Sequence, residues 1–120
     1  MSRAARGRRA HLSGLAAEEA VARAYEAAGG RVEARRWRAP EGELDLVVRT
    51  PEALVFVEVK AGRNAPEAIS ARQWMRLEAA AARYMLAHPT GDGAVRFDAA
   101  FLGPDGSVRV VENARGFDEW

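Results

Sequence analysis

The sequence predicts one α/β domain in which helices pack on a single mixed β-sheet. Two long runs of helix-forming residues alternate along the 120-residue chain with shorter runs rich in valine, leucine and phenylalanine. Clusters of glycine, proline and aspartate separate these runs, and we find no internal repeat, low-complexity linker or domain boundary. The order of one helix, three strands, one helix and two strands favours a mixed sheet flanked by helices.

The first helix is expected from Leu15 to Ala28, after a flexible basic arm at residues 1–13 that precedes a single domain at residues 14–120. The run LAAEEAVARAYEAA is rich in helix formers and stops at a pair of glycines. Its apolar residues share one arc of a helical wheel: Leu15, Val21, Ala22, Tyr25 and Ala28. Glu18 lies in the middle of that arc and Glu19 at its edge. Because a carboxylate centred on a buried stripe needs a partner, Glu18 is a candidate functional residue.

Three strands are expected next. The first, near Arg31 to Trp37, shows only weak alternation of apolar and polar residues. The second and third, GELDLVVR and ALVFVEVK, are more strongly patterned and flank the loop Thr50–Ala53. Pro51 stands in this loop where a type I turn accepts proline, so the two strands should form a hairpin.

A second helix and two further strands complete the expected fold. Ser70 and Gln73 are spaced as a capping box at the start of a helix over residues 71–87, and His88-Pro89 ends it. The strands at residues 94–102 and 108–111 flank the turn GPDGS.

Composition restricts the chemistry. There is no cysteine, and the two histidines, His11 and His88, are far apart in the sequence, so any metal site must rest on oxygen ligands. No apolar run approaches the ~20 residues that span a bilayer, and no signal-type apolar core follows the basic start, so we expect a cytoplasmic protein without a membrane partner.

The net charge of +1 hides a basic segment at the start of the chain. Residues 1–11 contain four arginines and no acid: Arg3, Arg6, Arg8 and Arg9. Such an arm can hold a phosphate backbone without sequence preference. The alternative is a solvated, disordered terminus.

The expected hairpin sets two carboxylates against each other. A loop of Thr50–Ala53 fixes the cross-strand pairs as Arg49–Leu54, Val47–Phe56, Asp45–Glu58 and Glu43–Lys60. Directly opposed like charges destabilise a sheet. Either one carboxyl is protonated with a raised pKa, or a divalent cation lies between Asp45 and Glu58. Magnesium suits an all-oxygen site of this kind.

Lys60 is the only lysine among eighteen basic residues. Beside a magnesium site, a lysine amine can orient or deprotonate the attacking water, or stabilise charge on a phosphate. The alternative is a solvent-facing charged patch, which is common on amphipathic sheets. Gln73 could face the site or cap its helix, and Trp37 could stack on a base, although a core or interface position is favoured.

The segments AEEAVARAYEAAGG, RRWRAPEGELDLVV, LVFVEVKAGR, ISARQWMRLEAAAARYM and RFDAAFL resemble the YraN-like family of small bacterial proteins over about residues 14–117. GELDL followed by VFVEVK is the most specific part. That family is similar to archaeal Holliday-junction resolvases and other restriction-endonuclease-like, PD-(D/E)xK nucleases. The resemblance implies a restriction-endonuclease-like fold, with a central mixed sheet flanked by helices.

The resemblance also implies roles for individual residues. It makes Asp45 and Glu58 metal ligands, Lys60 the catalytic lysine and Glu18 a helical glutamate of the same catalytic site, with Mg²⁺ or Mn²⁺ as cofactor. Glu43 matches the family's GE(I/L)D motif, where its role is open.

Two departures from the family pattern concern arginine. The arginine usual two residues after the lysine is shifted to Arg63, which is expected to bind nucleic acid. Arg36 stands where the family often has asparagine.

Two functions follow from this set. The first is a magnesium-dependent endonuclease, which is a hydrolase. In this enzyme, water attacks a phosphodiester bond of structured, branched or damaged nucleic acid, and DNA is the favoured substrate. As in the resolvases, a homodimer would place two sites across a branched substrate. The second is a non-catalytic module on a nuclease-like fold that binds nucleic acid or a partner.

Overall fold

The computed structural model describes residues 3–61, 69–91 and 93–115, with residues 3–13 described as helix backbone only. Its elements are α1 (Arg3–Ala27), β1 (Arg31–Ala39), β2 (Gly42–Arg49), β3 (Ala53–Ala61), α2 (Ala71–Ala87), β4 (Ala94–Leu102) and β5 (Val108–Val111). The strands form one sheet in the order β1-β2-β3-β4-β5, which is parallel between β3 and β4 and antiparallel elsewhere. The predicted α/β fold is therefore confirmed, and the arrangement is consistent with a restriction-endonuclease-like fold.

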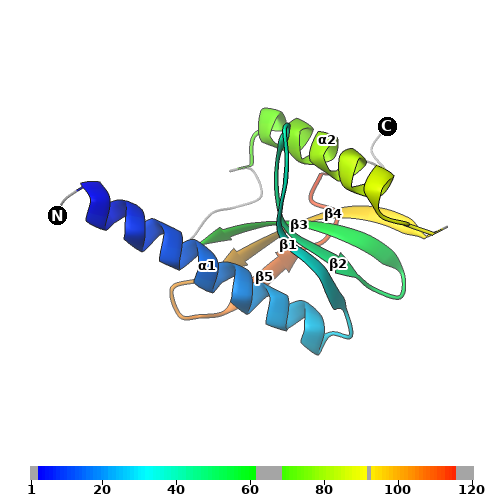
Figure 1. Cartoon of the computed structure of the whole chain (residues 1–120). Helices are drawn as coiled ribbons and strands as arrows, with labels where there is room; N and C mark the ends of the chain where they lie inside the picture. Colours follow the sequence, from blue (N-terminus) through cyan, green and yellow to red (C-terminus); the bar gives the residue numbers. More distant parts are fainter. Residues whose placement is uncertain (1–2, 62–68, 92, 116–120) are drawn as a thin grey trace.

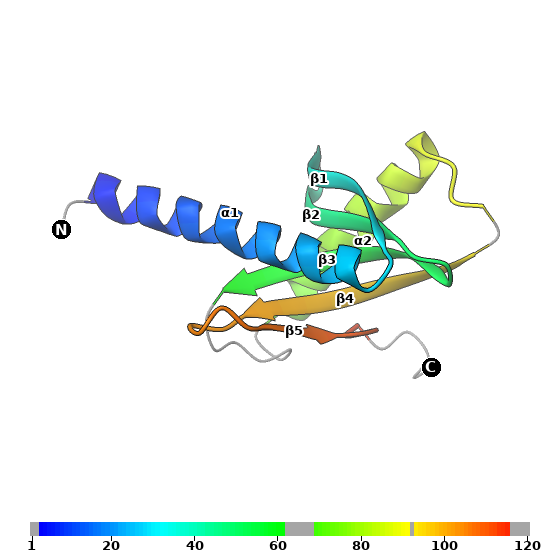
Figure 2. The same cartoon turned by 90° about the horizontal axis from the view of Figure 1, so that it is seen from below.

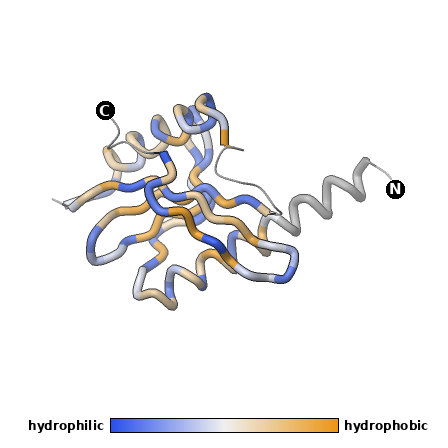
Figure 3. Tube along the Cα trace, turned by 180° about the vertical axis from the view of Figure 1, so that it is seen from behind, coloured by the Kyte–Doolittle hydropathy of each residue, from blue (hydrophilic) through white to orange (hydrophobic). Residues whose placement is uncertain are grey.

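The two helices cover opposite faces of the sheet (Figure 1). On one face α2 packs its Trp74, Leu77 and Tyr84 against Phe56 and Phe97 of the sheet. On the other face the C-terminal half of α1 forms a second core with apolar residues of the central strands: Val21, Ala22 and Tyr25 against Leu46, Val48, Val55, Val57 and Ala100. Figure 3 shows the apolar residues gathered along these central strands. Because both faces are covered, β3 reads as a continuous apolar run.

Two glycines connect α1 to β1. Gly29 has a φ of 95°, in the left-handed region that glycine adopts at helix ends. A Cβ on Gly30 would lie 2.9 Å from a methyl carbon of Val48 and 3.0 Å from the carbonyl oxygen of Tyr25. The end of α1 can therefore approach β2 closely only because residue 30 has no side chain.

One predicted boundary is wrong. α1 begins at Arg3 rather than at Leu15, so residues 3–13, expected as part of an arm, have helical backbone. The physical reason is that this segment is rich in alanine and arginine and contains no proline, so the helix can continue toward the N-terminus despite Gly7. The N-terminal half of α1 extends beyond the sheet (Figure 2).

The hairpin between β2 and β3 explains where the sheet opens. The expected pairs Arg49–Leu54 and Val47–Phe56 are present, but the ladder ends at Leu46–Val57. Beyond that point β2 leaves β3, and the connection between β1 and β2 reaches α2, where Glu41 pairs with Arg83. An opening therefore lies between β2, β3 and the N-terminal half of α2.

Candidate functional site

Asp45 lies where β2 leaves β3, and its side chain replaces a ladder contact. Its Oδ2 accepts a 2.8 Å hydrogen bond from the backbone N–H of Val59. The pairs that form have the predicted register, but the expected direct pairs Asp45–Glu58 and Glu43–Lys60 are absent, because the ladder of β2 and β3 is shorter than predicted. The reason is local: a carboxylate that takes the N–H of the facing strand keeps the two backbones apart.

Asp45 and Glu58 nevertheless line the same cleft, and each affects the pKa of the other. Burial, with the charges of Glu18 and Glu43, raises the pKa of Asp45 to about 6, although the hydrogen bond from the Val59 N–H lowers it in part. Burial and repulsion from Asp45 raise the pKa of Glu58 to about 8, although Lys60 opposes the shift. The raised pKa of Glu58 thus reflects the repulsion expected between these two acids.

Two side chains hold the Glu58 carboxylate. Gln73 donates from Nε2 to Glu58 Oε1 at 3.1 Å, and the Lys60 ammonium lies 3.6 Å from the same oxygen. The Gln73 backbone N–H also donates to Ser70 Oγ at 3.1 Å. The side chain of Gln73 therefore faces the site, while of the expected capping box the structure shows the bond from the Gln73 backbone to Ser70.

Three carboxylates converge at the opening from two elements. Glu18 of α1 and Glu43 and Asp45 of β2 each offer an oxygen, and these oxygens lie within 4.8 Å of one another. We call these three residues, with Glu58, the acid cluster. Glu19 is outside it, because its carboxylate pairs with Arg35 at 2.6 Å and with Arg23 at 3.4 Å on the exposed side of α1.

Arg36 neutralises Glu18. Its Nε lies 2.6 Å from Glu18 Oε1 and its Nη2 lies 3.3 Å from Oε2, a bidentate contact. The bond to Glu18, with the charges of Glu43 and Asp45, raises the pKa of Arg36.

Arg36 also has an uncommon backbone conformation. Its φ is 48°, in the left-handed region that costs energy for an arginine but that asparagine tolerates well. The asparagine that the family often has at this position is therefore the one feature of the sequence that singles out residue 36. The contact of Arg36 with Glu18 was not predicted from the sequence.

A cleft of about 440 Å³ lies between three residues of the acid cluster, Glu43, Asp45 and Glu58, and the N-terminal half of α2. Its lining residues are Glu41, Gly42, Glu43, Asp45, Glu58, Ser70, Arg72, Gln73, Arg76 and Leu77. We call it the acid cleft. Arg72 and Arg76 were not among the expected site residues, because only the packing of α2 shows that they face the carboxylates.

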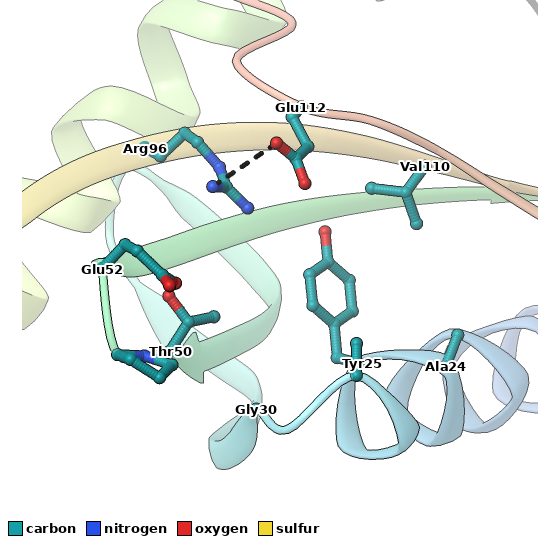
Figure 4. Close-up of a pocket in the computed structure, with 10 residues that line it drawn as sticks. Ala24, Tyr25, Gly30, Thr50, Glu52, Arg96, Val110 and Glu112 are labelled. Carbon is teal, nitrogen blue, oxygen red and sulfur yellow. Dashed lines mark ion pairs between the residues drawn. The ribbon is translucent and has the colours of Figure 1, made fainter.

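A separate pocket of about 310 Å³ shares no lining residue with the acid cleft and lies between α1, the β2–β3 turn and β5 (Figure 4). Behind it, Asp98 is fully buried and accepts hydrogen bonds from Tyr25 Oη at 2.7 Å and from the Arg96 guanidinium at 2.8 and 2.9 Å. Burial and the bond to Asp98 raise the pKa of the Tyr25 hydroxyl. These groups satisfy one another, so they serve the fold.

The other predicted residues divide into two groups. Trp37 packs edge-on against Tyr84, with ring centroids 5.3 Å apart, which confirms the core interpretation over base stacking. Arg63 and the side chains of Arg3, Arg6, Arg8 and Arg9 lie outside the described residues, so their expected contacts with nucleic acid stay predictions. Within the described parts of the chain, neither helix is long and apolar enough to cross a membrane.

Fold and site together define a class: an α/β domain whose mixed sheet carries a cluster of carboxylates where two strands separate. The chain belongs to a bacterial family described as Uncharacterised protein family UPF0102, whose model matches residues 17–102. This membership confirms the resemblance to the YraN-like family, and the matched segment contains the acid cluster, Lys60 and both arginines of the acid cleft.

Relatives match over nearly the whole chain. The UPF0102 protein SPO0400 of Ruegeria pomeroyi is 46% identical over 117 residues, which covers 94% of this chain and 95% of the relative. A UPF0102 protein of Azorhizobium caulinodans is 46% identical and covers 88% of this chain and 83% of its own. A UPF0102 protein of Dinoroseobacter shibae is 44% identical, with 93% and 87% covered.

Proposed function

We propose that the protein is a divalent-metal-dependent nuclease that hydrolyses phosphodiester bonds of structured or branched nucleic acid. The observation that supports this most is the convergence of Glu18, Glu43 and Asp45 from α1 and β2, with Glu58 in the same cleft as Asp45 and Lys60 beside Glu58. Surface carboxylates are usually spread apart by repulsion, so four in one partly buried place favour a cation site.

The donor set fits magnesium or manganese. It consists of carboxylate oxygens alone, and three of them are close enough to share one ion. Asp45 and Glu18 would hold the ion with Glu43 and, after Glu58 loses its proton, with Glu58. When bound, the metal supplies Lewis-acid polarisation of a phosphoryl oxygen and neutralises charge on the phosphate.

The chain's own residues prepare the site. Lys60, with 29% of its side chain exposed, can orient the attacking water or stabilise charge that develops on the phosphate. Gln73 fixes the Glu58 carboxylate through Nε2, and Arg36 fixes Glu18 by its bidentate contact. Gln73 is thus a positioning residue rather than a catalytic one, whereas Arg36 would compete with the ion for Glu18.

A second candidate is a binding module that does not turn over substrate. The observation in its favour is that the chain itself already neutralises part of the site, since Arg36 pairs with Glu18 and Lys60 lies 3.6 Å from Glu58 Oε1.

The deciding experiment is a cleavage assay with Mg²⁺ or Mn²⁺ on branched, flapped, duplex and single-stranded DNA and RNA. Asp45→Ala should abolish cleavage, and Glu26→Gln, a change at an exposed residue of α1, should leave it intact. Metal-independent binding that survives Asp45→Ala, without cleavage by the wild type, would support the binding module instead.

Lys60→Arg tests the enzyme more narrowly. Arginine keeps the charge but is planar, bulkier and effectively never deprotonated, so it cannot replace a compact amine at the site. We expect cleavage to fall by two orders of magnitude or more, as for loss of one catalytic donor, while nucleic-acid affinity changes little. Wild-type cleavage by Lys60→Arg would refute a catalytic role for this residue.

A further inference from the structure

Two arginines on the N-terminal half of α2 line the acid cleft. Arg72 and Arg76 are one helical turn apart, so they lie on the same face of the helix, and both are exposed. A Cβ on Gly42 would lie 3.6 Å from the Cβ of Arg76, so the start of β2 packs directly on α2 at this residue. The packing fixes the base of Arg76 at the edge of the cleft.

These arginines differ from others in the part of the chain whose side chains are described. Nine arginines there form an ion pair with a carboxylate: Arg23, Arg31, Arg35, Arg36, Arg38, Arg49, Arg83, Arg96 and Arg115. Arg72 and Arg76 form none with any described residue, although the cleft they line contains four acids. Their charges are therefore open to an external anion.

The acids of the cleft are engaged elsewhere, which explains this. Glu41 pairs with Arg83, and Glu43 accepts a 3.1 Å hydrogen bond from Arg38. Glu58 is held by Gln73 and Lys60. The cleft thus has a carboxylate wall whose members have their own partners, and on α2 two guanidiniums that pair with no described carboxylate.

The helix itself adds to the positive wall. Arg72 lies in the first turn of α2, and Ser70 and Gln73 of the same turn also line the cleft. The N-terminal end of a helix carries a partial positive charge. An anion that enters here meets the helix end and both guanidiniums together.

We propose that Arg72 and Arg76 bind backbone phosphates of a nucleic-acid strand and so hold that strand across the acid cluster. The identity of the anion rests on the proposed nuclease function, since a substrate whose scissile phosphate lies at the acid cluster must continue along the cleft. Contacts of this kind recognise the backbone and not the bases. The two arginines therefore provide affinity and register without sequence preference.

The test is a binding measurement that does not depend on cleavage. A fluorescein-labelled DNA duplex, and a four-way junction built from the same sequence, are titrated in EDTA and followed by fluorescence anisotropy over a series of NaCl concentrations. Each phosphate contact on B-DNA contributes about 0.9 to the slope of log K against log [salt]. Arg72→Gln with Arg76→Gln should reduce the slope by about 1.8 and weaken binding at least about tenfold at moderate salt.

The matched control removes the same charge elsewhere. Arg23 and Arg31 have 76% and 72% of their side chains exposed and do not line the cleft. Arg23→Gln with Arg31→Gln should change the slope little. The conservative pair Arg72→Lys with Arg76→Lys should keep most of the slope, because it retains both charges.

Three results would overturn the proposal: equal slopes for the two double glutamine variants, an unchanged slope for the cleft variant, or no binding by the wild type. Wild-type DNA binding that depends on Arg72 and Arg76, without cleavage under any metal condition, would refute the nuclease alone. Circular dichroism of each variant confirms that a loss of binding is not a loss of fold.

Discussion

Glu58→Gln should make the protein more stable above neutral pH. Glutamine has the shape of the protonated glutamic acid, can donate a hydrogen bond to Asp45 and can accept the one from Gln73, but it cannot ionise. In the wild type, burial and the charge of Asp45 raise the pKa of Glu58 from 4.5 to about 8. The folded protein therefore holds a proton that the unfolded chain releases.

The sign and size follow from proton linkage. A raised carboxyl pKa means that the unfolded state binds fewer protons than the folded state, so this contribution to the free energy of unfolding is complete below about pH 4.5 and is lost as pH rises toward about 8. At 1.36 kcal/mol per pKa unit, the full shift corresponds to about 5 kcal/mol. Because Asp45 and Glu58 each affect the pKa of the other, we expect about 3 kcal/mol for Glu58 alone.

The measured quantity is the difference in free energy of unfolding between Glu58→Gln and wild type, from urea denaturation followed by circular dichroism between pH 4.5 and 9. We expect near-equality at the acidic end and an advantage of about 3 kcal/mol for the variant at pH 9. Glu26→Gln, at an exposed position of α1, should track the wild type throughout. Parallel pH profiles for Glu58→Gln and wild type would refute the burial and repulsion argued for this carboxyl.

Other substitutions test the groups around the acid cluster and the second pocket. Arg36→Asn should tighten Mn²⁺ binding about tenfold in titration calorimetry, because the ion no longer competes with a bidentate guanidinium for Glu18. Arg35→Asn, which removes only the contact with Glu19, is the control, and equal Mn²⁺ affinities in the two variants would contradict the role of Arg36. Asp98→Asn should cost about 3 kcal/mol of unfolding free energy in urea denaturation, since it leaves the Arg96 charge without its buried partner. Glu112→Gln, at a side chain that is 69% exposed, should cost under about 0.5 kcal/mol, and a similar small loss for Asp98→Asn would show that the buried pair is not structural.

The sequence determined the parts of this protein that depend on local rules. A four-residue loop with proline sets the register of a hairpin, and Arg49–Leu54 pairs as expected. A serine three residues before a glutamine begins a helix, and α2 starts after Ser70. Helical periodicity placed Glu18 on the inward face of α1. For this reason the sequence alone predicted an acid from this helix at the site.

Only the tertiary structure decided the composition of the site. Neither the pairing of Arg36 with Glu18 nor the approach of Arg72 and Arg76 to the carboxylates follows from local rules, because each joins side chains of different elements. The separation of β2 from β3 on the N-terminal side of Leu46 likewise accompanies a contact between strands, the hydrogen bond from the Val59 N–H to Asp45. Sequence periodicity fixes the face on which a side chain lies, whereas the curvature of the sheet and the position of the helices fix which faces meet, and that depends on the packing of the whole domain.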